Sequence, residues 1–193
     1  AIALDLLEIP RFVIGPALAT LFASFVRMAL ALQQSEKSHA AENLAKLDDL
    51  TGLPNRRRFI SEVEQYQNGS ILLMDLDGFK PVNDTYGHET GDEILRQVSN
   101  RFLKAIPSGS LLARLGGDEF AVLMHGNYEE AMELAMALRA TLSYPFNVNG
   151  EGIRVDVSIG CVSNDGKSDL MSRADTAMYK AKQAQVGVWA GRT

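Results

Sequence analysis

Cysteine and histidine are scarce in this chain of 193 residues, which has one Cys and three His. A single cysteine excludes a disulfide within the chain and is typical of a reducing compartment. Cys161 lies in an apolar, strand-like run, so we expect it to be a small buried residue. The histidines, His39, His88 and His125, are too scattered for a metal site of their own. With no Cys/His cluster, nothing in the sequence indicates zinc.

An excess of positive charge is also missing, because 19 Lys and Arg residues face 24 Asp and Glu residues, for a net charge of -5. The chain therefore lacks the excess of Lys and Arg that is typical of proteins that bind nucleic acid. An anionic nucleotide would need local basic residues or metal ions. The content of 46% hydrophobic and 22% charged residues is that of a globular protein, and the length allows one domain plus an extension.

The first 47 residues differ from the rest, and we treat 1–47 as an N-terminal helical region. Residues 12–32 are mostly apolar, and as a helix they would extend about 30 Å, which matches a hydrocarbon core. Arg27 opposes a span unless it lies near the helix end and reaches the interface. A membrane contact through 12–32 is therefore one interpretation, and an amphipathic helix packed on a partner subunit is the other. A cleaved signal peptide fits poorly, since no cleavage-like site with a basic flank precedes the run.

Residues 33–49 are polar and favour a helix that would carry a signal from the first segment to the following domain. The Gly and Pro of residues 51–55 are expected to end it.

From residue 48 to 193, helical and extended patterns interleave. The expected helices are 56–66, 93–105, 128–142 and 170–185, the expected strands are 71–75 and 153–162, and a hairpin is expected at 111–125. Thr90-Gly91-Asp92-Glu93 reads as a capping box for the second of these helices. The pattern predicts an α/β (α+β) domain with a mixed central sheet flanked by helices.

The hairpin carries Gly116-Gly117-Asp118-Glu119-Phe120 between two short apolar runs. The glycines favour a tight turn and a close approach of a ligand to the backbone. The turn would present two adjacent carboxylates, for which a cation is the natural partner. A solvated acidic hairpin tip is the alternative interpretation of these five residues.

A second acidic motif, Asp75-Leu76-Asp77-Gly78, follows the first strand. The EF-hand reading fails, because Lys80 and Tyr86 stand where that loop needs Gly and Glu. If the first strand and the hairpin are neighbours, Asp75 meets the two carboxylates of the hairpin. Clustered carboxylates that hold two Mg²⁺ ions are the usual arrangement for in-line attack at phosphorus.

Residues 83–92 offer a third group. Asn83 and Asp92 together provide donors and acceptors that match a guanine edge, although loop and helix-cap chemistry is the favoured interpretation of these residues taken alone. Lys182, on the last helix, is a fourth candidate, and a surface Lys is normally solvated.

Four stretches, in order and at family-like spacing, resemble the GGDEF domain of diguanylate cyclases over residues 48–183. They are DDLTGLPNRR at 48–57, DLDGFKPVNDTYGHETGD at 75–92, RLGGDEF at 114–120 and ADTAMYKAK at 174–182. The resemblance implies a fold similar to nucleotidyl cyclases and polymerase palm domains. It also implies that a homodimer condenses two GTP molecules into cyclic di-GMP and releases pyrophosphate.

By the same resemblance, each site residue has an expected role. Asp75, Glu119 and the Leu76 carbonyl would bind Mg²⁺ (or Mn²⁺), and Asp118 would be the base or a second metal ligand. Asn83 and Asp92 would read the guanine, with His88 nearby. Lys80 and Lys182 would contact the phosphates.

Two departures from the family pattern matter. Val186 stands where the family often has a phosphate-binding Arg. An inhibitory product site, Arg-x-x-Asp, is not expected, because those positions hold Pro107 and Ser110. The rival interpretation is a weak or silent GTP-binding module that regulates a neighbouring phosphodiesterase domain. We expect the GGDEF domain to be cytoplasmic and its parent protein to be anchored in the inner membrane.

Overall fold

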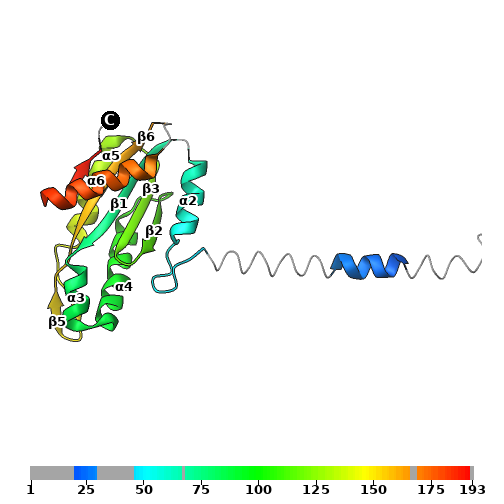
Figure 1. The fold of residues 1–193 in the computed structure, drawn as a ribbon, viewed down its shortest axis with the longest axis horizontal. Helices are drawn as coiled ribbons and strands as arrows, with labels where there is room; N and C mark the ends of the chain where they lie inside the picture. The colour runs from blue at the N-terminus through cyan, green and yellow to red at the C-terminus, as the bar shows by residue number, and fades with distance from the viewer. Residues whose placement is uncertain (1–19, 30–45, 67, 166–168, 192–193) are drawn as a thin grey trace, which may run out of the picture. The chain divides into compact units, whose positions relative to one another are not determined.

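A five-stranded sheet in the order β2-β3-β1-β6-β7 organises the domain (Figure 1). The computed structural model describes residues 20–29, 46–66, 68–165 and 169–191. The strands of this sheet are β1 (Gly69–Asp77), β2 (Leu111–Gly116), β3 (Glu119–Met124), β6 (Asp156–Asn164) and β7 (Val188–Ala190). Strand β1 runs antiparallel to both β3 and β6, whereas β6 and β7 are parallel. The predicted mixed sheet is therefore confirmed.

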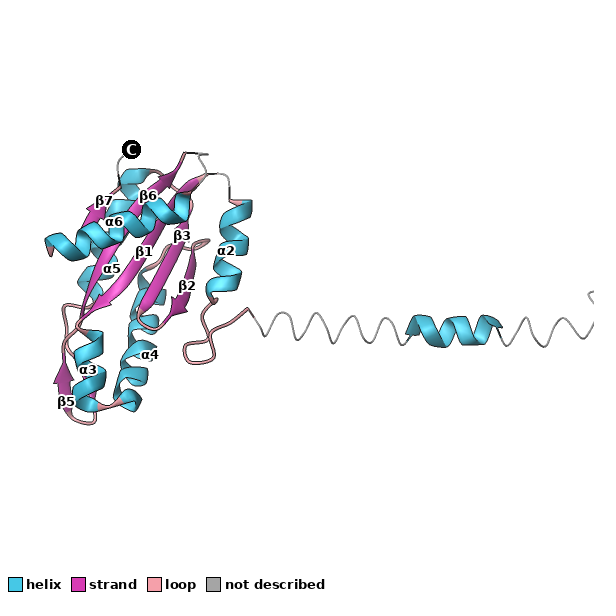
Figure 2. Ribbon diagram, in the orientation of Figure 1, coloured by secondary structure: helices cyan, strands magenta, loops and turns pink. Residues whose placement is uncertain are grey.

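Helices cover both faces of the sheet (Figure 2). Their bounds are α2 Arg56–Gln65, α3 Phe79–Tyr86, α4 His88–Ala105, α5 Tyr128–Thr141 and α6 Leu170–Ala184. A small hairpin of β4 (Phe146–Val148) and β5 (Glu151–Ile153) stands apart from the main sheet.

Strand β1 is the centre of two hydrophobic cores. Leu72, Met74 and Leu76 pack with α3, α4 and α5, while Ile71 and Leu73 pack with α2 and α6. This alternation is the two-residue period of an extended strand whose faces are both covered. Asp75 continues the α6-facing series, which places a carboxylate at the end of an otherwise apolar strand.

Helix α6 packs directly against the backbone of Gly160 in β6. A Cβ atom at this position would lie 2.1 Å from the backbone nitrogen of Met178 and 2.5 Å from the carbonyl oxygen of Ala174. Only a residue without a side chain allows this contact, which sets the position of the helix that carries Lys182.

The expected capping box is wrong, because α4 begins at His88 rather than at Glu93. Gly87, with φ of 84°, turns the chain directly from α3 into α4. Thr90 lies within α4, and its hydroxyl donates to the carbonyl of Tyr86 at the end of α3 rather than to the start of a helix at Glu93.

The expected linker helix over 33–49 is also wrong in its last residues, 46–49, which are not helical. Lys46 and Leu47 are already part of a loop, in which Leu47 bridges to Pro54 and the Asn55 side chain donates to the Leu47 carbonyl. The expected strand 153–162 is displaced, because Ile153 belongs to β5 and β6 begins only at Asp156.

Residues 20–29 are helical, and the rest of the expected 12–32 helix lies outside the described residues. The side chains of Leu21, Phe22, Phe25 and Met28 are exposed. Among the helices that the structure describes, none has both the length and the hydrophobicity needed to cross a bilayer.

Substitution of Gly160 by Ala should destabilise the fold by about 1–3 kcal/mol, because the added methyl group meets the backbone of α6. The matched control is Gly152→Ala in β5, where the nearest atom to the new methyl would be 3.7 Å away. Urea unfolding of both variants and the wild type checks this. Equal midpoints for the two variants would contradict the tight contact.

Candidate active site

The β2–β3 hairpin presents the acidic pair on a turn of two glycines. Gly116 and Gly117 have φ of 141° and 53°, values that side-chain-bearing residues rarely adopt. A Cβ on either residue would meet nothing within 4 Å, so the backbone here borders open space. The predicted hairpin is present, and its turn leaves room for a bulky ligand.

Strand pairing brings the second acidic motif to this turn. Asp75 is the direct cross-strand partner of Glu119, and the Leu76 amide donates to the carbonyl of Asp118 at 3.2 Å. The first strand and the hairpin are therefore neighbours, which is the condition under which Asp75 was expected to meet Asp118 and Glu119.

Two cations from different helices pair with these carboxylates. Lys182 of α6 lies 2.5 Å from Asp75, and Arg56 of α2 lies 3.3 Å from Glu119. The hydrogen bond to Asp75 raises the pKa of Lys182, so its ammonium group stays charged at neutral pH. Sequence reasoning did not assign Arg56 a role, although it lies within the 48–57 stretch that resembles the family.

Asp118 has no cationic partner of its own in these ion pairs. Burial and, next, the negative charge of Asp75 raise the pKa of the Asp118 carboxyl. The site thus carries more negative charge than its two cations neutralise locally, which is the condition under which an added cation binds.

Within the described part of the chain, no group of three or more His, Cys, Asp or Glu side chains is arranged to hold a metal ion. Two of the three carboxylates pair with Arg56 and Lys182 instead. The donor chemistry nevertheless fits a divalent cation, because Asp75, Glu119 and the Leu76 carbonyl are all hard oxygen ligands. Burial and the negative charge of Asp75 raise the pKa of the Asp118 carboxyl, and a bound cation would offset that negative charge.

Behind this cluster lies a second acidic pair that sequence reasoning left without a role. Burial raises the pKa of Asp77, although its carboxylate accepts a hydrogen bond from Ser158 at 2.8 Å. Asp156, its cross-strand partner, forms an ion pair with Arg139 of α5 at 2.7 Å. Only the fold could show this, because Asp77 and Asp156 are 79 positions apart in the sequence.

The expected guanine readers lie on two helices that touch. Asn83 of α3 packs against Gly91 of α4, and a Cβ on Gly91 would lie 1.9 Å from Asn83 Oδ1. Asp92 is the next residue of α4, so the two residues lie on neighbouring helices, and their joint role in reading guanine stays a prediction. His88, at the start of α4, and Lys80, at the start of α3, are exposed to solvent.

Val186, which follows the end of α6, lies beside Arg139 of α5. It lines a cavity of about 840 Å³ together with Asp77, Arg139 and Asp156. Arg139 donates to the Val186 carbonyl at 3.2 Å. At the other position of interest, Pro107 and Ser110 are joined by a backbone hydrogen bond in a turn before β2.

Three comparisons with known proteins agree on one family. The family described as "Diguanylate cyclase, GGDEF domain" matches residues 45–187. MucR of Pseudomonas aeruginosa, named a bifunctional diguanylate cyclase/cyclic di-GMP phosphodiesterase, is 37% identical over 166 residues, which are 79% of this chain and 24% of MucR. The response regulator PleD of Caulobacter vibrioides is 37% identical over 75% of this chain and 35% of its own length. The chain thus spans about a quarter to a third of these relatives.

Solved structures give the same result for the fold. The GGDEF domain of TpbB (YfiN) from Pseudomonas aeruginosa matches with a TM-score of 0.70 and 31% identity, and the match covers 76% of this chain and 94% of that one. The GGDEF domain of DgcB from Caulobacter crescentus, solved in complex with c-di-GMP, matches with a TM-score of 0.71 and 28% identity over 77% of this chain and 97% of that one.

Replacing Asp118 by Asn should stabilise the metal-free protein at pH 7, because it removes a carboxylate whose pKa the fold raises. A raised pKa means that the folded state bears an extra cost once the group is ionised. That cost is complete above the folded-state pKa and absent below the unfolded value of about 3.9. The gain in urea midpoint should therefore shrink as the pH falls toward about 4.

The matched control is Asp175→Asn, on the exposed surface of α6. Urea unfolding with a chelator present, between pH 4 and pH 8, measures both variants. A lower midpoint for Asp118→Asn at pH 7 would show that Asp118 supports the fold rather than strains it.

Proposed function

Because the chain belongs to the GGDEF diguanylate cyclase family, we propose that it condenses two molecules of GTP into cyclic di-GMP with release of pyrophosphate. The observation that carries the proposal is the pairing of Asp75 with Glu119 across β1 and β3, beside the Gly116-Gly117 turn. This arrangement supports phosphoryl chemistry, because it gathers carboxylates and a protonated Lys next to open backbone.

Each side chain of the site has a role in the proposed reaction. Lys182 and Lys80 would bind the triphosphate, and Lys182 would exchange its Asp75 partner for a phosphate oxygen. Asp118 would accept the proton of the attacking 3′-hydroxyl, and its raised pKa suits a base. A divalent cation, Mg²⁺ or Mn²⁺, held by Asp75, Glu119 and the Leu76 carbonyl, would neutralise charge at the phosphate oxygens.

The reaction requires two copies of the chain. One domain with one GTP supplies one 3′-hydroxyl and one α-phosphate, so a cyclic product needs a second domain that faces the first. We therefore propose a homodimer, with the region 1–47 controlling its geometry. The proposal includes a cytoplasmic location for the GGDEF domain, where GTP is available, and membrane contact through 12–32.

The second candidate is a weak or silent GTP-binding module beside a phosphodiesterase domain. Val186, where the family often has Arg, favours it. So does the likeness to PdeR of Escherichia coli, which is named a cyclic di-GMP phosphodiesterase and is 36% identical over 79% of this chain and 25% of PdeR. Incubation of the purified protein with GTP and Mg²⁺ separates the two, because a silent module forms no cyclic di-GMP and a weak one forms it only slowly.

Glu119→Gln should lower the turnover number by about 10²–10³-fold, because it removes charge that the transition state needs. The fold should survive, since Glu119 is partly exposed and its ion pair with Arg56 is a surface contact. Glu62→Gln, which breaks another surface ion pair, with Arg58 of α2, is the control. A Glu119→Gln protein with more than about half of the wild-type rate would refute the assignment.

Asn83 and Asp92 should make the site prefer GTP over ATP, because a site built for one base edge leaves polar groups unpaired with the other. The dissociation constant of ATP should exceed that of GTP by at least about tenfold. Calorimetric titration with each nucleotide and Mg²⁺ measures this. Equal affinities would remove the guanine assignment from both residues.

A further inference from the structure

Arg114 of β2 holds the turn that carries Asp118 through hydrogen bonds to its backbone. Its Nε and Nη2 atoms donate to the carbonyl oxygen of Gly117 at 3.0 and 2.8 Å. Gly117 directly precedes Asp118, and β2 carries an irregularity between Arg114 and Gly116 at the point where the chain folds back. The guanidinium therefore fixes the one peptide group between the flexible glycines and the first catalytic carboxylate.

The third nitrogen of the same guanidinium is held by Asp48. Arg114 Nη1 lies 3.0 Å from each carboxylate oxygen of Asp48, and both side chains are largely buried. Burial opposes ionisation of Asp48, but hydrogen bonds from Thr51 and Arg114 outweigh it and lower the pKa of this carboxyl. Asp48 is therefore charged at neutral pH and fully engaged.

Asp48 lies in the loop 46–55, with which the GGDEF domain begins. The Asn55 amide donates to the carbonyl of Lys46, and the Arg114 amide donates to the carbonyl of Pro54. The loop is thus closed on itself and attached to β2 beside the guanidinium. A continuous set of hydrogen bonds runs from the start of the domain to the turn that carries Asp118.

We propose that Arg114 is a positioning residue for the catalytic turn and that Asp48 sets its orientation, so that the loop 46–55 controls where Asp118 and Glu119 lie. This inference rests on the proposed cyclase function for its kinetic consequence alone. Its structural consequence, an ordered turn, holds for any chemistry at this site.

Lysine cannot replace Arg114 in this role. A guanidinium presents donors in a planar fork, so it can hold the Gly117 carbonyl and the Asp48 carboxylate at the same time. An ammonium group keeps the charge but lacks the fork. Arg114→Lys therefore separates the positioning role from simple charge neutralisation.

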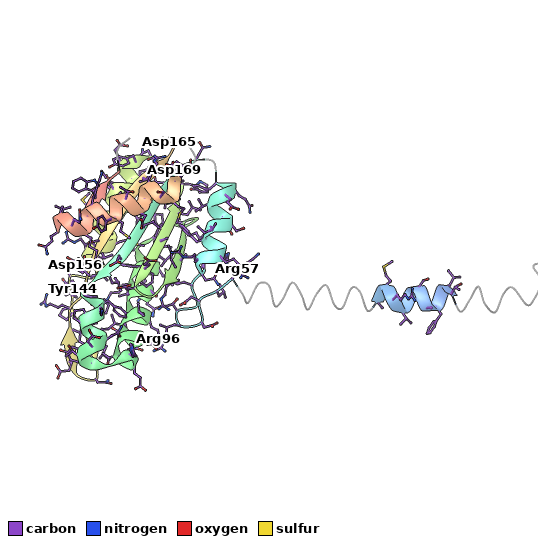
Figure 3. All side chains as sticks on the ribbon, in the orientation of Figure 1. Arg57, Arg96, Tyr144, Asp156, Asp165 and Asp169 are labelled. Atoms are coloured by element: carbon purple, nitrogen blue, oxygen red, sulfur yellow. The ribbon has the colours of Figure 1, made fainter. Side chains whose placement is uncertain are left out.

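The experiment compares Arg114→Lys and Asp48→Asn with a matched pair of residues, Arg173 and Asp165, at the end of β6 that lies away from the active site. There Arg173 contacts Asp165 at 2.7 Å and the Ser163 carbonyl at 3.3 Å, which is the same combination of contacts. Asp165 lies far along the domain from Asp156, which marks the active-site end of β6 (Figure 3). Arg173→Lys and Asp165→Asn are the controls.

Two readouts are measured on the full chain. The first is hydrogen exchange of the Leu76 amide, whose bond to the Asp118 carbonyl reports the position of the turn without any substrate. The second is the split between kcat and KM for GTP. Arg114→Lys and Asp48→Asn should speed exchange at Leu76 by about tenfold or more and lower kcat by about 10- to 100-fold, with KM changed by less than about threefold. The controls should change neither.

The double variant Asp48→Asn/Arg114→Lys should behave like Arg114→Lys alone, because both substitutions break one contact set. If the wild type forms no cyclic di-GMP, the proposed function fails and exchange at Leu76 alone decides the positioning role. The role is overturned if Leu76 exchange in Arg114→Lys and Asp48→Asn matches that of the controls, or if exchange rises while kcat does not fall in an active enzyme. A variant that does not fold leaves the decision to its partner variant.

Discussion

Negative charge concentrated at one end of the sheet is the constraint on which the rest of the structure depends. Strand pairing forces Asp75 and Glu119 to be direct neighbours, and the Asp118 carbonyl accepts from the amide of Leu76. Two carboxylates about 4 Å apart repel by about 4 kcal/mol at an effective dielectric of 20. The hydrophobic packing of β1 on both faces resists this repulsion, because β1 cannot move without exposing the core residues that it buries on each side.

The helices supply the opposing charge as well as the core. Arg56 comes from α2, Arg139 from α5 and Lys182 from α6, and each reaches a different carboxylate. These pairs are partly exposed, so each contributes little to stability, about 0–1 kcal/mol. Weak pairing is useful at a site where substrate binds, because a triphosphate or a cation can replace a partner at small cost.

The sequence predicted the features that local pattern determines. The apolar run before Asp75 gave the central strand, and the glycine pair gave the hairpin that carries Asp118. Local pattern failed where the tertiary contact decides the structure, as in the early start of α4, which depends on the turn that Gly87 makes with a positive φ. The contact between Asp48 and Arg114 joins residues that are 66 positions apart, so no window of sequence contains it. The short strand β7 was missed because three residues give too little pattern to read.

The surroundings of Val186 bear on how the proposed substrate would be bound. Arg139 lies beside it, yet its guanidinium already contacts Asp156 through Nε and Nη2 and the Val186 carbonyl through Nη1. Arg139 is therefore not free to act as a phosphate contact in place of the family's arginine, and in the proposed reaction the triphosphate would be bound by Lys80 and Lys182. A weaker contact lowers the fraction of domains that hold GTP. In the proposed dimer both domains must be loaded at once, so the rate at low GTP follows the square of that fraction. For the proposed cyclase, weaker triphosphate binding at this position would therefore widen the range of GTP concentrations over which the rate rises steeply.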